Sequence, residues 1–144
     1  MGYALRVNHV HPVQIYYEDT DLSGVVYHAN YLRYFERARE HLLGVQALVD
    51  LWKNEGVGFV VYKAGMTFKE GAELGDGLEI RTTVKLESDY RLAFGQDAWR
   101  VSEREIPCSP KLLVQGRVEL ACVDAEKKLC RLPRHVVDRL IESP

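Results

Sequence analysis

The sequence has few cysteines, and their spacing excludes several classes of protein. Its 144 residues include only Cys108, Cys122 and Cys130, an odd number with no C-x-x-C pair. A disulfide-stapled secreted domain needs an even and denser set, and a zinc site needs closely spaced pairs. We therefore expect free thiols in a reducing compartment, which predicts a cytoplasmic protein.

Long hydrophobic runs and basic runs are also missing. No apolar stretch approaches the roughly 20 residues of a membrane-spanning helix, and the first ten residues lack the apolar core of a secretory signal. The formal net charge of -2, without a basic cluster, argues against nucleic acid as a partner. No repeat or linker interrupts the chain, so residues 1–144 are predicted to form a single domain.

Several catalytic and metal-binding signatures are absent. There is no G-x-S-x-G elbow, no G-x-G-x-x-G loop and no P-loop, which excludes the serine hydrolases and nucleotide-binding enzymes that carry them. The five histidines never recur at i, i+4, so no metal ligand set is expected. The run from Asp19 to Gly24 begins like a calcium loop, but its twelfth position is Asn30 where that loop needs glutamate.

The first half of the chain predicts one strand and one long helix. Val10–Tyr17 is rich in β-formers and reads as a strand. From Asn30, a candidate N-cap, apolar residues recur at helical spacing as far as Trp52, and Gly56 is a candidate stop. The helix would make about six turns. Gly44 inside it costs about 1 kcal/mol relative to alanine, so we expect close packing or a slight bend there.

The second half predicts strands. Residues 57–68, 78–86, 92–102 and 112–124 are strand-like, and the alternation from Leu78 to Leu86 predicts one wet face. A last short strand ending at Pro133 and a terminal helix from Arg134 to Ile141 would follow. The fold class is therefore α+β, with one long helix against a mostly antiparallel sheet of five or six strands. One helix is too small to cover the apolar surface of such a sheet, which predicts that the protein forms at least a dimer.

The stretch from Tyr17 to Arg39 carries the chemistry and reads Y-E-D-T-D-L-S-G-V-V-Y-H-A-N-Y-L-R-Y-F-E-R-A-R. It leads from a strand through an acidic turn into a helix, whose unpaired N–H groups can hold an anion formed during a reaction. Asp21 lies seven residues before His28, and Gly24 lets the chain fold back between them. Asp21 could also be only a turn or capping residue.

This stretch resembles the hotdog-fold acyl-CoA thioesterases, in the branch of 4-hydroxybenzoyl-CoA thioesterase and the Tol–Pal-associated thioesterase. The resemblance implies a curved sheet wrapped around the helix, and hydrolysis of a short-chain aliphatic or aromatic acyl-CoA. Asp21 would be the nucleophile or the general base. The His28 N–H would polarise the thioester carbonyl, and the side chains of Tyr17 and His28 would assist. A departure is His41, where the family often has an acid.

The resemblance also implies a binding site and partners. Tyr27, Asn30 and Tyr31 are expected to bind substrate, with the acyl group along the helix near Tyr31 and Tyr34. Coenzyme A would enter only as part of the substrate, so no cofactor or metal is expected, and acyl carrier protein is an alternative acyl donor. The assembly would be a homodimer or a dimer of dimers, which is a homotetramer.

Two alternatives stay open from the residues alone. Glu36, on the helix, is a rival nucleophile, although an ion pair with a neighbouring arginine is its more ordinary role. Asp19 is expected to be structural, because alternate residues of an extended chain point in opposite directions. The whole domain could also bind acyl carriers or a partner protein without turnover, since a fold does not fix a function.

Overall fold

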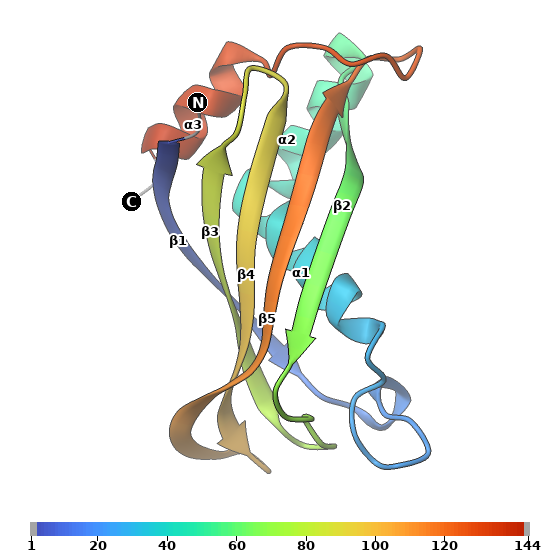
Figure 1. Cartoon of the computed structure of the whole chain (residues 1–144), viewed down its shortest axis with the longest axis vertical. Helices are drawn as coiled ribbons and strands as arrows, with labels where there is room; N and C mark the ends of the chain where they lie inside the picture. The colour runs from blue at the N-terminus through green and yellow to red at the C-terminus, as the bar shows by residue number, and fades with distance from the viewer. Residues whose placement is uncertain (1–2, 143–144) are drawn as a thin grey trace.

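Five antiparallel strands form one curved sheet in the order β1-β3-β4-β5-β2 (Figure 1). The computed structural model describes residues 3–142, and the side chains of residues 8–140. The strands are β1 (Tyr3–Gln14), β2 (Gly58–Phe68), β3 (Gly77–Leu86), β4 (Arg91–Glu103) and β5 (Ile106–Val123). The α+β class and the antiparallel sheet are thus confirmed, with five strands in the described chain.

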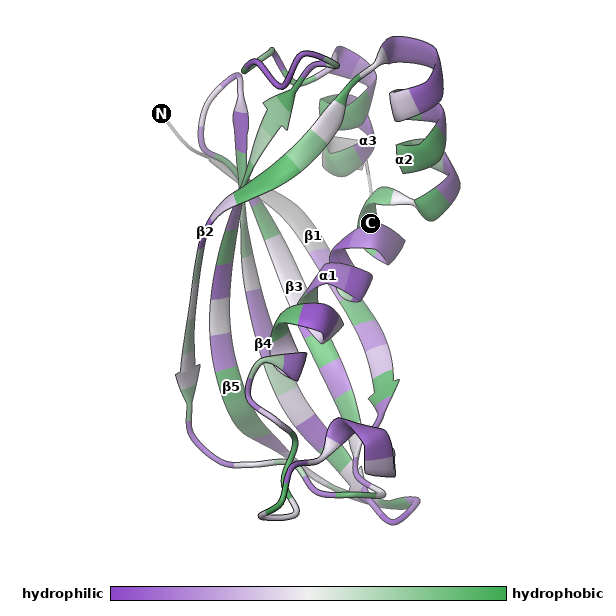
Figure 2. Cartoon of the chain, turned by 90° about the vertical axis from the view of Figure 1, so that its right-hand side faces the viewer, coloured by the Kyte–Doolittle hydropathy of each residue, from purple (hydrophilic) through white to green (hydrophobic). Residues whose placement is uncertain are grey.

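Three α-helices lie on one side of this sheet (Figure 2). They are α1 (Asn30–Leu43), α2 (Val45–Asp50) and α3 (Arg134–Glu142). The apolar stripe predicted for the first helix faces the sheet, where Tyr31, Phe35 and Ala38 of α1 are buried in one cluster with sheet residues. This core holds α1 in place, and the chain entering α1 comes from the end of β1.

The predicted single long helix is wrong, because the helix breaks at Gly44. Gly44 has φ +96°, a conformation that residues with a side chain rarely adopt, and its N–H closes α1 by bonding to the Glu40 carbonyl at 2.7 Å. A Cβ at this position would lie 2.6 Å from Nη2 of Arg139 on α3. The expected close packing is therefore present, and with it comes a full break rather than a slight bend. After α2, a π-helical turn (Leu51–Glu55) ends at Gly56, the predicted stop.

The ends of two other elements also differ from the sequence prediction. β1 stops at Gln14 instead of continuing to Tyr17, because its partner strand β3 begins at Gly77, opposite Gln14. The chain then makes a short 3-10 turn, η1 (Tyr17–Asp19). The strand predicted before Pro133 is reduced to a single bridge between Val123 and Leu129.

The alternation predicted for β3 is confirmed, since its even-numbered residues from Leu78 to Leu86 are all buried. In β5, the alternation in the sequence predicts that Leu112, Val114, Val118, Leu120 and Cys122 lie on one side, and this prediction fails at Leu112. Leu112 is half-buried, whereas Leu113 and Val114 are fully buried. A register shift against β4 explains this difference, because one step on β4, from Ala98 to Trp99, matches two steps on β5.

A buried polar cluster fastens α1 to the middle of the sheet. The Arg39 guanidinium donates to Oε1 of Gln96 on β4 at 2.9 Å. The Gln96 amide donates to the Phe35 carbonyl at 2.9 Å and to the Thr82 hydroxyl at 3.2 Å. These groups satisfy one another inside the core, which defines how α1 lies across the strands.

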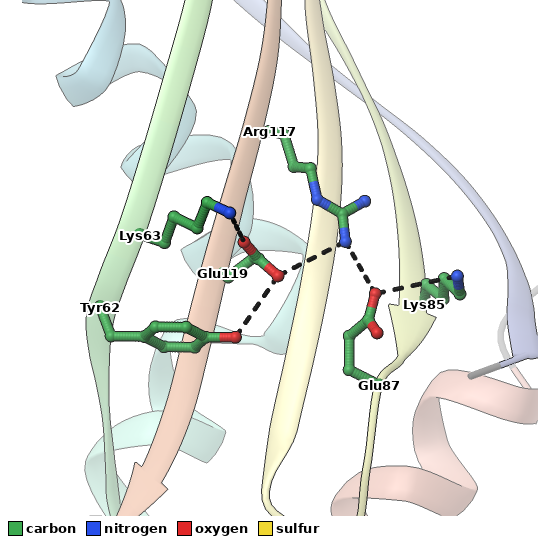
Figure 3. Close-up of polar contacts among 6 residues, drawn as sticks. All are labelled: Tyr62, Lys63, Lys85, Glu87, Arg117 and Glu119. Carbon is green, nitrogen blue, oxygen red and sulfur yellow. Dashed lines mark hydrogen bonds and ion pairs between the residues drawn. The ribbon is translucent and has the colours of Figure 1, made fainter. Parts of the chain in front are cut away.

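The opposite face of the sheet carries a row of paired charges (Figure 3). Glu119 of β5 lies 3.9 Å from Nζ of Lys63 and 3.4 Å from Nη2 of Arg117, and it accepts a hydrogen bond from the Tyr62 hydroxyl. Arg117 reaches on to Glu87 at 2.7 Å. The charges on this part of the outer face are therefore paired with one another, and the main apolar core lies on the side of α1.

Candidate active site

The segment between β1 and α1, called the junction below, is a tight loop held by hydrogen bonds of its own backbone. It lies at the end of the sheet where β2 finishes (Figure 1). Thr20 and Val26 form a β-bridge, and the Asp21 N–H donates to the Val25 carbonyl at 2.8 Å. Gly24 completes the turn at φ +85°, with its N–H bonded to the Asp21 carbonyl at 3.0 Å. The turn that the sequence predicted around Gly24 is thus present.

Asp21 presents an exposed, ionised carboxylate on this turn. Its Oδ1 accepts hydrogen bonds from the Ser23 hydroxyl at 2.6 Å and from the Ser23 N–H at 2.9 Å. The Ser23 hydroxyl, helped by nearby backbone N–H groups, lowers the pKa of the Asp21 carboxyl below its usual value. The group is therefore an anion at neutral pH, with its second oxygen available to water or substrate.

Asp19 has a different and structural role, as its position predicted. Its carboxylate accepts the Tyr16 N–H at 2.8 Å. Its carbonyl oxygen accepts two hydrogen bonds, from the Tyr27 N–H at 3.0 Å and from the Asn30 side-chain amide at 2.9 Å. Asp19 thereby connects the start of the junction to Asn30, the first residue of α1.

The N-terminus of α1 leaves backbone donors unpaired. Helical bonding starts with the Asn30 N–H on the Tyr27 carbonyl at 2.8 Å and continues with the Tyr31 N–H on the His28 carbonyl. Within the described chain, the N–H groups of His28 and Ala29 donate no hydrogen bond to protein. An anionic oxygen placed here would meet free donors at the positive end of the helix. Asn30 is the first helical residue and not the N-cap, because Ala29 already has helical dihedrals.

The His28 side chain lies in an aromatic group at the end of β2. Its ring centroid is 4.7 Å from that of Tyr27 and 6.2 Å from that of Phe68, which it meets edge-on. Phe68 also contacts Tyr31, with ring centroids 5.9 Å apart. Tyr27 is half-exposed and can touch a ligand directly, whereas Tyr17 is 80% exposed on η1.

Tyr31, predicted to bind substrate, is a core residue in the single chain. It is only 2% exposed, and its hydroxyl accepts the Ala72 N–H at 3.3 Å. The Asn30 amide is likewise occupied by the Asp19 carbonyl. In the single chain, Tyr31 and Asn30 therefore support the junction from inside the protein. Of the three residues predicted to bind substrate, Tyr27 is the one whose side chain is exposed at the surface.

The sequence predicted that Tyr34 lies near the acyl group but not that it is buried, and it did not place Arg39 in the core. Tyr34 is fully buried, and burial followed by the Asp19 carboxylate raises the pKa of its phenol well above the usual value. Arg39 lies in the core, although a charged residue at that position reads as surface. The helical spacing of Tyr34 and Arg39 from Tyr31 and Phe35 was the signal that could have placed them inward.

Two hollows flank α1. A groove of about 460 Å³ lies on the β1 side, lined by Asp19, Asn30 and Arg37 among others. A smaller hollow of about 210 Å³ lies between α1 and β2, where Glu36 and Arg39 meet Phe59 and Val61. Glu36, the alternative acid, is exposed at this second hollow and lies about two helical turns after the start of α1.

Metal and membrane features are not found in what the structure describes. No three histidine, cysteine or acidic side chains gather as a metal site within the described residues. His11 of β1 does stack on His41 of α1, with ring centroids 4.6 Å apart, a pairing that chain spacing could not reveal. None of the helices within residues 3–142 combines the length and apolarity that crossing a membrane requires.

Comparison with known proteins gives one consistent result. The thioesterase-like superfamily matches residues 16–140. Over 132 residues the chain is 39% identical to the acyl-CoA thioester hydrolase YbgC of Escherichia coli, covering 88% of this chain and 90% of that protein. It is 35% identical over 128 residues to the acyl-CoA thioesterase YbgC of Haemophilus influenzae, covering 87% and 88%.

The fold agrees with these relatives. The crystal structure of a 1,4-dihydroxy-2-naphthoyl-CoA thioesterase from Synechocystis superposes with a TM-score of 0.80 at 25% identity, covering 94% of this chain and 96% of that one. The resemblance predicted from the junction is thereby confirmed at the level of family and fold. The chain belongs to the thioesterase-like superfamily, a family of thioester hydrolases with the hotdog fold.

Proposed function

We propose that this enzyme hydrolyses the thioester of a short-chain aliphatic or aromatic acyl-CoA at the junction between β1 and α1. One observation carries the proposal: an ionised carboxylate, Asp21, lies on a tight turn leading into a helix whose first N–H groups are unpaired. The relatives named for acyl-CoA thioesters support the substrate class. The free thiols support a reducing, cytoplasmic location.

In the proposed reaction, the thioester carbonyl oxygen accepts a hydrogen bond from the His28 N–H. Negative charge grows on that oxygen as the carbonyl carbon is attacked, and the helix N-terminus stabilises it. Asp21 either attacks the carbon itself, giving an anhydride that water then opens, or removes a proton from the attacking water. Both routes break the C–S bond and release coenzyme A as a thiol. In a single turnover in heavy-oxygen water, label found in the Asp21 carboxylate identifies the nucleophilic route, because general-base catalysis leaves its oxygens unchanged.

The surrounding residues have proposed supporting roles. Tyr17 and the His28 ring would orient the attacking group, and Tyr27 would contact the acyl or pantetheine part of the substrate. Tyr31 and Asn30 would form the inner wall of the site, since burial holds Tyr31 and a hydrogen bond holds Asn30 in place. The reaction needs no cofactor, and acyl carrier protein is an alternative donor of the same thioester.

We also propose a homodimer, or a dimer of dimers, joined at β2. This strand is an edge of the sheet, and it exposes Val60, Val61 and Tyr62 by 44%, 51% and 45%. An apolar edge strand left unpaired tends to pair with another chain. The His28 ring lies at the end of the same strand, so a second chain paired there would close the site beside the junction.

The first test is thiol release from a panel of acyl-CoA esters, from short aliphatic to long-chain and aromatic. Asp21→Asn is expected to keep the fold and lower kcat by about a thousandfold, which is typical of losing an essential catalytic group. Asp124→Asn is the matched control, because Asp124 is also an acid whose Oδ1 accepts two turn N–H groups, from Glu126 and Lys128. It should retain activity.

Glu36→Gln separates the rival assignment. Full activity in this variant with loss in Asp21→Asn supports Asp21, and the reverse pattern assigns the chemistry to Glu36. A folded wild type that binds acyl-CoA esters without releasing any thiol would contradict the hydrolase and support a binding domain. Acyl carrier protein loaded with the preferred acyl group, tested beside the coenzyme A ester, identifies the carrier.

A further inference from the structure

Two cysteines lie in contact at the end of β5, far along the chain from Asp21. Sγ of Cys122 and Sγ of Cys130 are 3.5 Å apart. The Cys130 N–H donates to the Cys122 carbonyl at 3.0 Å, and Val123 and Leu129 form a bridge just beyond them. The two cysteines thus face each other across a short antiparallel pairing. Such partners have Cα atoms about 5.5 Å apart, within the range that a disulfide spans.

The two thiols differ in access. Cys122 is fully buried, and burial followed by the neighbouring Cys130 raises the pKa of its thiol to about 12. Its Sγ also donates to the Arg131 carbonyl at 3.7 Å. Cys130 is half-buried and is the sulfur of the pair that an oxidant from solvent reaches first. The buried thiol is then already in contact with the oxidised one.

We propose that Cys122 and Cys130 are a reversible oxidation site, which closes to a disulfide on reaction with a hydroperoxide. The Cys130 sulfur attacks the O–O bond of hydrogen peroxide, forming an S–O bond and releasing water that carries the thiol proton. The Cys122 sulfur then attacks the sulfenic acid of Cys130. The S–S bond forms as the S–O bond breaks, and a second water leaves with the Cys122 proton. The two thiols supply the two electrons that reduce the peroxide.

Formation of the Cys122–Cys130 disulfide needs only a local movement. The sulfurs must approach to about 2.05 Å, a change that rotation of the two side chains can provide. The bond would close the turn between Cys122 and Cys130 and fasten the connector that leads into α3. Leu140 of α3 is 2% exposed in the core, so this tether acts on the helix that covers the upper part of the sheet.

The experiment treats the whole reduced protein with hydrogen peroxide, blocks remaining thiols with N-ethylmaleimide, and maps them by mass spectrometry. We expect the intact mass to fall by two hydrogen atoms, one alkylated cysteine to remain at Cys108, and a peptide pair linked through Cys122 and Cys130. Dithiothreitol added to the oxidised protein before alkylation should restore three thiols that react with N-ethylmaleimide under denaturing conditions. The oxidised protein should melt about 5 °C higher than the reduced protein, as expected for a short closed loop.

Three variants make the outcome decisive. Cys108→Ser should oxidise as wild type does, because Cys108 lies near the opposite end of β5. Cys130→Ser should lose the linked peptide and the melting shift, and it keeps the buried Cys122 for packing. The proposal is overturned if Cys108 oxidises first while both other cysteines remain open to alkylation, or if the linked peptide joins different chains. Cys122→Ala gives a second check should Cys130→Ser fold poorly.

Discussion

The Asp21 carboxylate depends for its low pKa on Ser23, only two residues away. The Ser23 hydroxyl is the largest influence on that pKa, through its hydrogen bond of 2.6 Å to Oδ1. A general base or a carboxylate nucleophile works only when ionised, so this bond extends the active pH range toward acid. Neither residue is buried, which means that the effect is local and travels with the turn itself.

Ser23→Ala should therefore move the acid limb of the pH–activity profile to higher pH. Removing the hydrogen bond raises the pKa of Asp21 toward its ordinary value, so the carboxylate becomes protonated at a higher pH as the solution is acidified. Activity at neutral pH should change little. The measurement is kcat/KM of thiol release from about pH 3 upward, a range that spans the pH of about 4 at which a free Asp titrates. An acid limb identical in both proteins would show that Asp21 does not set it.

At the scale of elements, the break between α1 and α2 is the feature that most changes the prediction from sequence. An apolar stripe at helical spacing runs on through Gly44, so local pattern alone favours one continuous helix. The helix nevertheless breaks at Gly44, which has φ +96°, and the end of the Arg139 side chain, from the sequence-distant α3, packs against it. The break turns the chain toward α3 and leaves α1 with a defined C-terminus.

Gly44→Ala is expected to lower the free energy of unfolding by about 2 kcal/mol, because alanine is strained at this φ and its Cβ would displace the end of the Arg139 side chain. Urea denaturation followed by circular dichroism measures the loss. Gly58→Ala is the matched control. Its added Cβ would meet Trp52 at an ordinary 3.7 Å, and Gly58 has no positive φ. Equal losses in the two variants would contradict the role assigned to Gly44.

At the scale of the whole molecule, the two edges of the sheet are unequal. β1 is bordered by α3 and by α1, whereas β2 leaves a run of apolar side chains exposed beside the hollow between α1 and β2. The site at the junction is also open in the single chain, with Asp21 and His28 exposed. A second chain at β2 would cover both features at once, which is the physical reason for the proposed assembly.

Val61→Lys should weaken this assembly by at least about tenfold in Kd, since a charge would replace an apolar contact at the centre of the interface. Val10→Lys on β1 is the matched control, because Val10 and Val61 are exposed almost equally, at 50% and 51%. Sedimentation across a concentration series measures both. Dissociation by Val10→Lys and not by Val61→Lys would place the interface at the other edge.

The sequence by itself determined the family, the α+β class, the acidic turn around Gly24 and the inward face of β3. These features rest on local pattern: alternation, helical spacing and a contiguous motif each act over a few residues. The structural role of Asp19 could also be argued from its neighbours. The match to the thioesterase-like superfamily confirms the family that this stretch of sequence predicted.

The tertiary structure alone decided which side chains meet across the chain. The hydrogen bond from Arg39 to Gln96, the packing of Gly44 against Arg139 and the contact of Cys122 with Cys130 all depend on groups brought together from different elements. The same holds for the stacked rings of His11 and His41. Spacing along the sequence carries no information about such contacts, because packing of the helices on the curved sheet creates them.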